Sequence, residues 1–491
     1  MYFTMMTRLF VVLLSCSIFA FAQFPTPLEQ SNYSKLTTNA ELMEYVSAVD
    51  AARPDISMEI IAVSHGRKRI PALTITSGTA AEQKKKLKVL IFAQQHGNEV
   101  SGKEGALLLL KGFAEGRLTP LLKNVNLTLV PQMNPDGGDN DKRRNGAGMD
   151  LNRNHMIMTE PEVIGLHELY AKNDYDVTLD VHEYFPYDSV WKAWGYRKNN
   201  EVTIGLMTNL NTDDALRAFQ RDAFFPFFES YLQEKKIRFG EYTPLGPPHV
   251  SRMRNSTVDI NDGRQSFGIL GSFSFIQEGL HHERSIDSIR RRAETQCEAM
   301  TAFITFMNRN ADTLRTMVKK AKATRADRPT TAILMDHTGD GKQSLTFSSY
   351  DGLRDTTMVV PNYHNTVIPL LTVTRPKGYL IPKKDTLLTD LLKKHKLKFA
   401  PYKAGKKDVV KQYLLEFQKQ PEIEEFTIYV SAAQQQTVQV KASDYLFVST
   451  KQRAAQLLIT ALEPQGMINL MQYDRFAYLR NEREYPVLRV E

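Results

Sequence analysis

Short apolar runs bounded by polar residues recur through the first two thirds of the chain and predict buried strands. They cover residues 58–64, 70–76, 88–93, 125–130, 177–182 and 272–278. Helical periodicity appears over Asn39–Val46 and again after Glu99. Strands that alternate with helices predict an α/β domain, with a mixed β-sheet covered by helices on both faces.

The pattern changes after a charged segment at residues 311–330, which is helical and then loop-like at Arg328-Pro329. Beyond it, residues 331–335 and 344–347 predict a hairpin that turns at Gly339-Asp340-Gly341. Residues 336–342 weakly resemble a calcium loop, but they lack its closing glutamate, so we interpret them as a turn. Further strands are expected at 367–374, 424–430 and 445–448, and further helices at 386–394 and 451–462.

These patterns divide the chain into a larger α/β domain and a smaller domain. We expect the first domain to span residues 23–315 and the second, an α+β accessory domain without a catalytic constellation, to span residues 330–491. The 491 residues, 42% of them hydrophobic, suffice for two such cores.

The amino terminus has the pattern of a signal peptide over residues 1–22. Arg8 precedes an apolar run that ends in Ala20-Phe21-Ala22, which predicts cleavage before Gln23 and export to the periplasm or the extracellular space. A lipid anchor on Cys16 is less favoured, because the apolar run continues past it. No later stretch approaches the length of a membrane span. After cleavage Cys297 would be the only cysteine, which excludes an intramolecular disulfide.

The net charge of +8 does not by itself indicate an anionic partner. The 63 basic residues are dispersed among 55 acidic ones, apart from short runs such as Lys84-Lys85-Lys86. We interpret this as an ordinary solvated surface and expect no nucleic-acid partner.

The candidate catalytic and metal-binding residues lie where the predicted strands end. His96 and Glu99 follow the strand at 88–93, and His182 ends the strand at 177–182, with Asp180 on the same face. Two imidazoles and a carboxylate suit a catalytic zinc ion that keeps one position open for water. Glu278 ends the strand at 272–278, and beside a metal it could accept a proton. Each of these residues alone is more simply a surface or structural side chain.

A loop rich in arginine and asparagine follows the Asn134-Pro135-Asp136-Gly137 turn and spans residues 143–154. A guanidinium offers a planar fork of donors, so such a loop suits binding a carboxylate. Taken alone, a solvated basic loop is an equally good interpretation.

Together these motifs, in this order over residues 35–310, resemble the zinc carboxypeptidase family, the M14 metallopeptidases typified by pancreatic carboxypeptidase A. The resemblance implies one zinc ion held by His96, Glu99 and His182. Asp150 would orient His96, and Arg143 would stabilise the oxyanion. Asn152 and Arg153 would bind the terminal carboxylate of a peptide substrate. Glu278 would be the general base.

One feature departs from the family pattern, which places a tyrosine about twenty residues before the catalytic glutamate. No tyrosine lies between Ser251 and Gln277, and Tyr242 is the nearest. The region holds Arg252, Arg254 and Arg264 instead. We hypothesise that one of these arginines favours an acidic group on the substrate; the alternative is ordinary ion pairing. His281 and His282 are expected to be structural or exposed.

Three functions compete on this pattern. The favoured one is an exported zinc metallocarboxypeptidase that hydrolyses C-terminal peptide bonds. The second is a zinc amidohydrolase, either a deacylase or a cell-wall peptide amidase, on the same scaffold. The third, a binding protein on an inactive scaffold, predicts a missing ligand or base, and every one of these residues is present.

Overall fold

The computed structural model describes residues 24–491, except 245, 418–421, 424–425, 428–429 and 482. The predicted signal peptide and Cys16 therefore lie outside the described residues, as does much of the strand expected at 424–430. Within the described residues, no helix is long and apolar enough to cross a membrane.

An eight-stranded mixed sheet organises the first region, with the order β1-β2-β4-β3-β5-β9-β7-β8. Its centre, β4-β3-β5-β9, is parallel, and antiparallel pairs flank it. The strands are β1 (Ile56–Val63), β2 (Arg69–Ile75), β3 (Leu87–Ala93), β4 (Val125–Val130), β5 (Val177–Tyr184), β7 (Val202–Gly205), β8 (Phe239–Glu241) and β9 (Phe273–Leu280). All six strands predicted for this region are confirmed.

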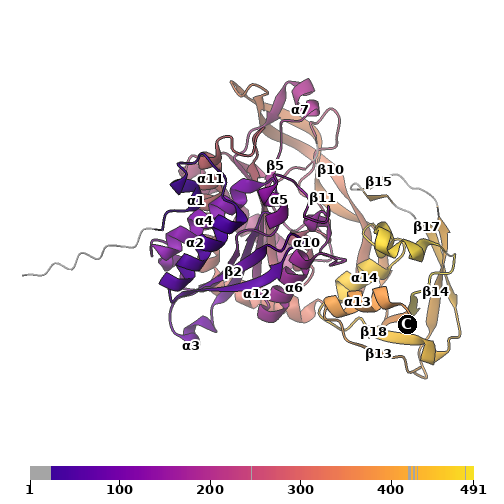
Figure 1. Ribbon diagram of the computed structural model, residues 1–491. Helices are drawn as coiled ribbons and strands as arrows, with labels where there is room; N and C mark the ends of the chain where they lie inside the picture. Colours follow the sequence, from indigo (N-terminus) through magenta and orange to yellow (C-terminus); the bar gives the residue numbers. More distant parts are fainter. Residues whose placement is uncertain (1–23, 245, 418–421, 424–425, 428–429, 482) are drawn as a thin grey trace, which may run out of the picture.

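Helices cover both faces of this sheet, as predicted (Figure 1). One face packs against α2 (Asn39–Ala52), α4 (Val100–Ala114), α9 (Phe225–Glu234), α11 (Ile289–Arg309) and α12 (Ala311–Thr324). The other face packs against α6 (Pro161–Asn173) and α10 (Gly263–Gly268). A short helix, α1 (Pro27–Gln30), precedes α2, and others lie between strands: α3 (Ala80–Gln83), α5 (Pro135–Asp139), α7 (Ser189–Trp194) and α8 (Asp214–Phe219).

The register of the parallel strands brings their carboxyl ends to one edge. Ala93 at the end of β3 lies opposite Val181 of β5, and His182 lies opposite Glu278 of β9. Open α/β sheets bind ligands at such edges. Residues separated by more than 180 positions in the sequence therefore share one site.

Gly97 allows a close approach of two loops at this edge. A Cβ atom at this position would lie 2.1 Å from the carbonyl carbon of Gly137, in the Asn134–Gly137 turn that begins α5. Only glycine leaves room for this contact. The turn thereby holds the segment from His96 to Glu99 in place.

The second region contains antiparallel sheets and two helices, which confirms the predicted α+β pattern (Figure 1). A six-stranded sheet has the order β13-β18-β12-β19-β14-β17. Its strands are β12 (Gly378–Pro382), β13 (Phe399–Pro401), β14 (Val410–Phe417), β17 (Val430–Thr437), β18 (Tyr445–Ser449) and β19 (Leu488–Val490), with a small separate pair, β15 (Glu422–Ile423) and β16 (Phe426–Thr427). The helices are α13 (Thr386–Lys394) and α14 (Ala455–Leu462).

The predicted hairpin turn at Gly339-Asp340-Gly341 is wrong. One strand, β10 (Thr330–Ser349), continues through these residues, and the chain turns at residues 350–354 into β11 (Asp355–Thr374). The pairing of β10 with β11 shifts register around Gly339 and Gly341. Glycine suits such irregularities as well as it suits turns, and the long partner strand decided between them. The turn assigned to residues 336–342 is corrected in the same way.

The long hairpin reaches back to the first region. Phe347 and Ser348 of β10 pair with Lys198 and Arg197 of β6 (Tyr196–Lys198). At the tip, the Tyr350 hydroxyl donates to the Tyr187 carbonyl oxygen at 3.0 Å. The domain boundaries at 315 and 330 stay a prediction.

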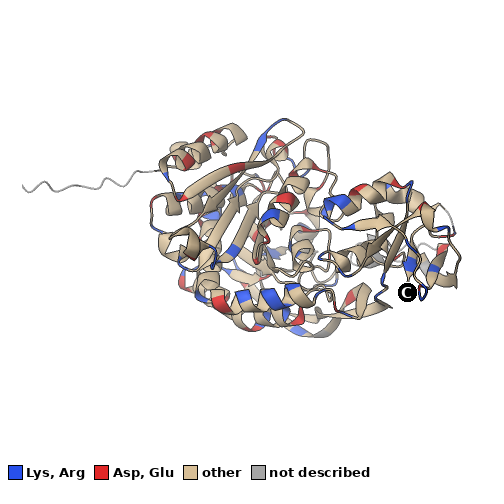
Figure 2. Ribbon diagram, turned by 90° about the horizontal axis from the view of Figure 1, so that it is seen from below, with Lys and Arg blue, Asp and Glu red and all other residues tan. Residues whose placement is uncertain are grey.

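Charged residues of both signs are interspersed over both regions in the view from below (Figure 2). This distribution agrees with the dispersal expected from the sequence.

Candidate metal centre

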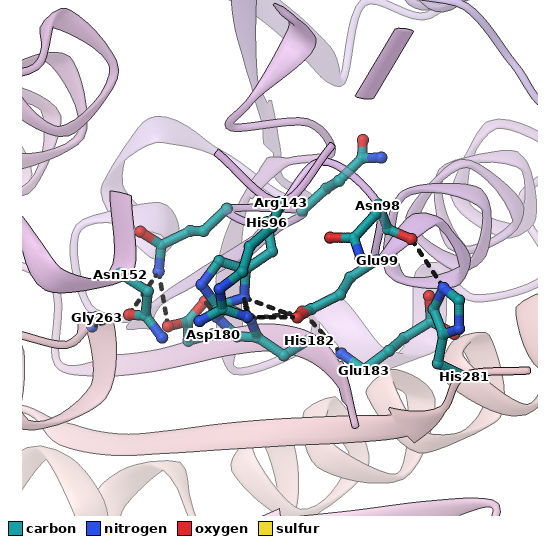
Figure 3. Close-up of polar contacts among 12 residues, drawn as sticks. His96, Asn98, Glu99, Arg143, Asn152, Asp180, His182, Glu183, Gly263 and His281 are labelled. Atoms are coloured by element: carbon teal, nitrogen blue, oxygen red, sulfur yellow. Dashed lines mark hydrogen bonds and ion pairs between the residues drawn. The ribbon is translucent and has the colours of Figure 1, made fainter. Parts of the chain in front are cut away.

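Three donor groups converge at the carboxyl edge of the sheet (Figure 3). His96 follows β3, Glu99 is the residue before α4, and His182 lies on β5. The Nδ1 atoms of the two imidazoles are 3.1 Å apart. The carboxylate oxygens of Glu99 lie 2.7 Å from Nδ1 of His96 and 2.8 Å from Nδ1 of His182. All three residues are buried.

Two aspartates determine which imidazole nitrogens face one another. Oδ1 of Asp150 lies 3.0 Å from Nε2 of His96, and Oδ1 of Asp180 lies 2.8 Å from Nε2 of His182, an ion-pair contact without hydrogen-bond alignment. A carboxylate favours the proton on the nitrogen beside it, which leaves the Nδ1 lone pairs directed at each other and at Glu99. Lone pairs and a carboxylate that converge in this way fit a divalent cation such as zinc.

The pKa shifts show the same attraction for positive charge. Burial would lower the pKa of His182, but the carboxylates of Asp180 and Glu99 outweigh burial and raise it well above the usual value. Burial would likewise raise the pKa of Glu99, but the two histidines hold it well below the usual value. The centre is thus a strongly cation-attracting site in a buried setting.

Glu278 lies beside this centre, in a cavity of about 260 Å³. Its side chain is 6% exposed, and no hydrogen bond or ion pair joins it to another described residue. Burial, aided by the charges of Glu99 and Asp180, raises its pKa to about 8, although His182 and Arg143 oppose this rise. A buried carboxylate without a partner is costly and is therefore reactive towards protons.

The other predicted site residues line the same cavity, apart from Asp150 beneath His96. Arg143 is half-exposed; its guanidinium contacts Asp150 at 3.0 Å and Glu99 at 3.4 Å. Asn152 and Arg153 stand in a short helical turn, Leu151–Arg153. The structure thus brings together all eight residues: His96, Glu99, Arg143, Asp150, Asn152, Arg153, His182 and Glu278.

Of the three arginines proposed to favour an acidic substrate, Arg264 lines the cavity. Arg252 is exposed and pairs with Asp336 at 3.1 Å, so ordinary ion pairing describes it. Arg254 is buried and donates to the carbonyl oxygen of Ser256. Arg264 is fully buried, pairs with Asp262 at 2.9 Å, and its Nε has no hydrogen-bond partner among the described residues.

The structure adds residues that the sequence did not single out as functional. Tyr242 lines the cavity after β8, and its pKa is raised by burial and by the charge of Glu278. Gln95, directly before His96, is fully buried among polar groups. His281, expected from the sequence to be structural or exposed, also lines the cavity, and its Nε2 lies 3.0 Å from the Asn98 carbonyl oxygen (Figure 3). The polar pair Gln94-Gln95, directly after an apolar strand, was the available signal for Gln95.

A buried three-donor cation site with an unpaired acid beside it, at the edge of an α/β sheet, defines the class of metal-dependent hydrolases. Comparison with known proteins narrows this class. A family model described as zinc carboxypeptidase matches residues 42–189. "Carboxypeptidase 2" of Trichophyton rubrum is 24% identical over 450 residues, which cover 87% of this chain and 81% of that protein.

Further similarities have lower coverage. "Carboxypeptidase D" of Drosophila melanogaster is 30% identical over 224 residues, covering 39% of this chain and 16% of that protein. A crystal structure of a metallo-carboxypeptidase from Burkholderia cenocepacia aligns with a TM-score of 0.44 and 19% identity, over 57% of this chain and 71% of that one. From the family model and the curated relatives, the chain belongs to the zinc carboxypeptidase family and is a metallocarboxypeptidase.

Proposed function

We propose that the protein is an exported zinc carboxypeptidase that hydrolyses the last peptide bond of a substrate with a free terminal carboxylate, and that Glu278 is its general base. The observation that carries this proposal is the position of Glu278. It is buried and unpaired in the cavity that is also lined by two of the metal donors, His96 and Glu99, and by the Asn152–Arg153 pair.

In this proposal each residue of the site has a role that follows from its charge. Arg153 and Asn152 donate to the terminal carboxylate, which sets the scissile bond one residue away from the chain end. Arg143, at the start of the same loop, also lines the cavity and stabilises the negative charge that develops on the carbonyl oxygen. Glu278 takes a proton from the attacking water and returns it to the leaving amine. When bound, zinc supplies Lewis acidity and lowers the pKa of water to about 7.

Asp150 and Asp180 act on the metal donors and not on the substrate. Each holds one imidazole in the tautomer whose Nδ1 lone pair faces the centre. The charge of His96, and then that of Arg143, overcome burial and keep the pKa of Asp150 well below its usual value. Asp150 therefore stays ionised and accepts from both of these groups over the working pH range.

A product profile against a mixed peptide library, with and without a chelator, tests this function. We expect stepwise release of single C-terminal amino acids, abolished by the chelator and absent from peptides with an amidated C-terminus. Release of acyl groups from N-acyl amino acids, without release of amino acids from peptides, would support the amidohydrolase alternative instead.

The side-chain preference rests on Arg264. Its buried side chain lines the cavity, and Nε keeps one unused donor, which would favour an acidic C-terminal residue. Its pairing with Asp262 reduces the net charge there. Rates on matched peptides ending in Glu, Leu and Lys test the preference. A clear preference for peptides ending in Leu or Lys would contradict the proposed preference for an acidic residue.

Export rests on the pattern of residues 1–22, with Arg8, the apolar run and Ala20-Phe21-Ala22. We expect the mature protein to begin at Gln23 and to be found outside the cytoplasm. Mass spectrometry of the purified natural protein tests both points. A lipid-modified Cys16 at the mature amino terminus would replace this proposal with the anchored alternative.

A further inference from the structure

Gln95 occupies an unusual place among the residues of the site. It follows β3, directly before His96, and its side chain is fully buried. Its amide contacts three polar groups: Nε2 lies 3.1 Å from Oδ1 of Asn152 and 2.8 Å from Oδ2 of Asp180, and Oε1 lies 2.8 Å from Nε2 of His155. None of these contacts belongs to the hydrolytic steps described above.

The partners allow one orientation of the Gln95 amide. A carboxylate accepts hydrogen bonds, so the amide nitrogen must face Asp180. The amide oxygen then faces His155, which must donate from Nε2. Burial lowers the pKa of His155 to about 4 and that of His167 well below its usual value, so both rings are neutral. Nδ1 of His155 therefore accepts from Nε2 of His167, 3.0 Å away.

The orientation of the Gln95 amide also fixes the orientation of the Asn152 amide. Its Oδ1 accepts from Nε2 of Gln95 and also from the backbone N–H of Gly263 at 2.8 Å. With the oxygen occupied by two donors, the amide nitrogen is the end of Asn152 that remains for the cavity, and no hydrogen bond joins it to another described residue. Figure 3 shows Asn152, Gly263 and Asp180 together on one side of the paired imidazoles. A substrate carboxylate needs a donor at this position.

The same Gln95 nitrogen also holds Asp180, whose other oxygen lies beside Nε2 of His182. One amide group thus touches both the substrate clamp and the support of a metal donor. We propose that Gln95 is a positioning residue, which turns the Asn152 amide towards the terminal carboxylate and fixes Asp180 behind His182. The part concerning Asn152 rests on the proposed carboxypeptidase function.

The substitution Gln95→Glu tests the proposal, since it keeps the shape and replaces a donor by a second acceptor. A carboxylate cannot donate to both Asn152 and Asp180, so Asn152 loses its fixed orientation. We expect KM for a peptide with a free C-terminus to rise about 100-fold and kcat to fall less. Gln95→Met removes the donor without adding charge, and we expect a rise in KM of about tenfold.

Gln220→Met is the matched control. Gln220 is also a fully buried glutamine with both amide ends bonded, to the Met207 N–H and the Ser274 carbonyl, outside the cavity. Its loss should lower thermal stability about as much as Gln95→Met does, and leave KM unchanged. Thermal melts of all three variants separate a loss of folding from a loss of positioning. If Gln95→Glu fails to fold, Gln95→Met decides the question.

Two small inhibitors give a readout besides turnover, measured by calorimetry on zinc-saturated protein. 3-Phenylpropionate has a carboxylate for the clamp, and acetohydroxamate binds a metal without one. We expect Gln95→Glu to weaken 3-phenylpropionate more than about tenfold and acetohydroxamate less than about threefold. Zinc affinity should fall about tenfold, through Asp180.

Wild-type values of KM and of 3-phenylpropionate affinity in Gln95→Glu would overturn the inference while leaving the proposed function intact. Equal weakening of both inhibitors would also overturn it, because it would show general damage to the centre. In contrast, wild-type protein that releases no C-terminal amino acid with zinc present would refute the proposed function itself.

Discussion

Two of the buried charge clusters among the described residues differ in one respect. In the second region, Glu463 accepts from the hydroxyls of Tyr379 and Tyr413, each at 2.6 Å, and forms an ion pair with Arg489. Both of its oxygens are occupied, and the residue is fully buried. At the metal centre, Glu278 is almost as buried but has no hydrogen bond or ion pair to any described residue.

The difference separates a structural cluster from a functional one. Buried carboxylates are costly unless hydrogen bonds and opposite charges satisfy them. The Glu463 cluster meets this condition with its own side chains and so links β12, β14 and β19 around the end of α14. The metal centre leaves Glu278 unsatisfied and directs three donors at one point, which are features that a metal and a substrate would complete.

Metal removal should produce the largest effect, and only at one cluster. Dialysis against a strong chelator should abolish peptide hydrolysis, and added zinc should restore it. Because zinc binds the folded chain, its removal should also lower the melting temperature. Calorimetry and an activity assay on the same sample measure both effects. Full activity of protein shown by elemental analysis to hold no metal would contradict the assignment of the centre.

The substitution Glu278→Gln should have the second-largest effect on activity. It keeps the shape but removes the proton acceptor, so kcat/KM should fall about 1,000-fold or more while zinc still binds. Stability should stay the same or increase, since the substitution replaces an unpaired buried acid by a neutral amide. Chemical denaturation and steady-state kinetics measure the two quantities. Retention of full activity would show that another group is the base.

Glu463→Gln should show the opposite pattern. It removes the fully buried counter-charge of Arg489 and leaves only the more exposed Glu491 paired with it, so the free energy of unfolding should fall by about 3 kcal/mol. KM and kcat should not change at a temperature where the variant is folded, because Glu463 lies outside the cavity. A large loss of kcat in fully folded Glu463→Gln would break the comparison between the clusters.

A third buried acid, Glu162 of α6, extends the comparison to the pH dependence of stability. Burial and the neighbouring Glu160 raise its pKa to about 7, and its contacts with the Asn145 amide are long, at 3.4 Å. The unfolded chain releases this proton near the ordinary value of 4.5, but the folded chain retains it until about pH 7. The stabilisation is therefore complete below about pH 4.5 and is lost as the pH rises towards 8.

Glu162→Gln should remove this slope. We expect wild-type protein to lose about 2 kcal/mol more than the variant between pH 5 and 8, as measured by denaturation at several pH values. Glu168→Gln serves as a control, since Glu168 lies on the same helix and is exposed. Parallel pH profiles of wild type and Glu162→Gln would show that Glu162 titrates normally.

Local patterns were sufficient for much of the fold. The apolar runs before His96 and ending at His182 and Glu278 predicted β3, β5 and β9, because burial on both faces of a parallel sheet requires near-continuous apolar residues. The period over Asn39–Val46 predicted α2, which the structure extends to Ala52 and caps with the Thr38 side chain. The turn at Gly339-Asp340-Gly341 failed, since glycine permits a turn and a bulge alike, and only the pairing with β11 distinguishes them.

The sequence by itself determined which chemical groups the site contains, since motif spacing records residue types that a zinc carboxypeptidase requires. It could not show that Gln95 joins Asn152 to Asp180, that Arg264 and not Arg252 lines the cavity, or that the hairpin of the second region reaches Tyr187. These relations depend on strand register and loop packing between distant segments. Hydrogen-bond direction and burial are properties of that packing, so only the tertiary structure decided them.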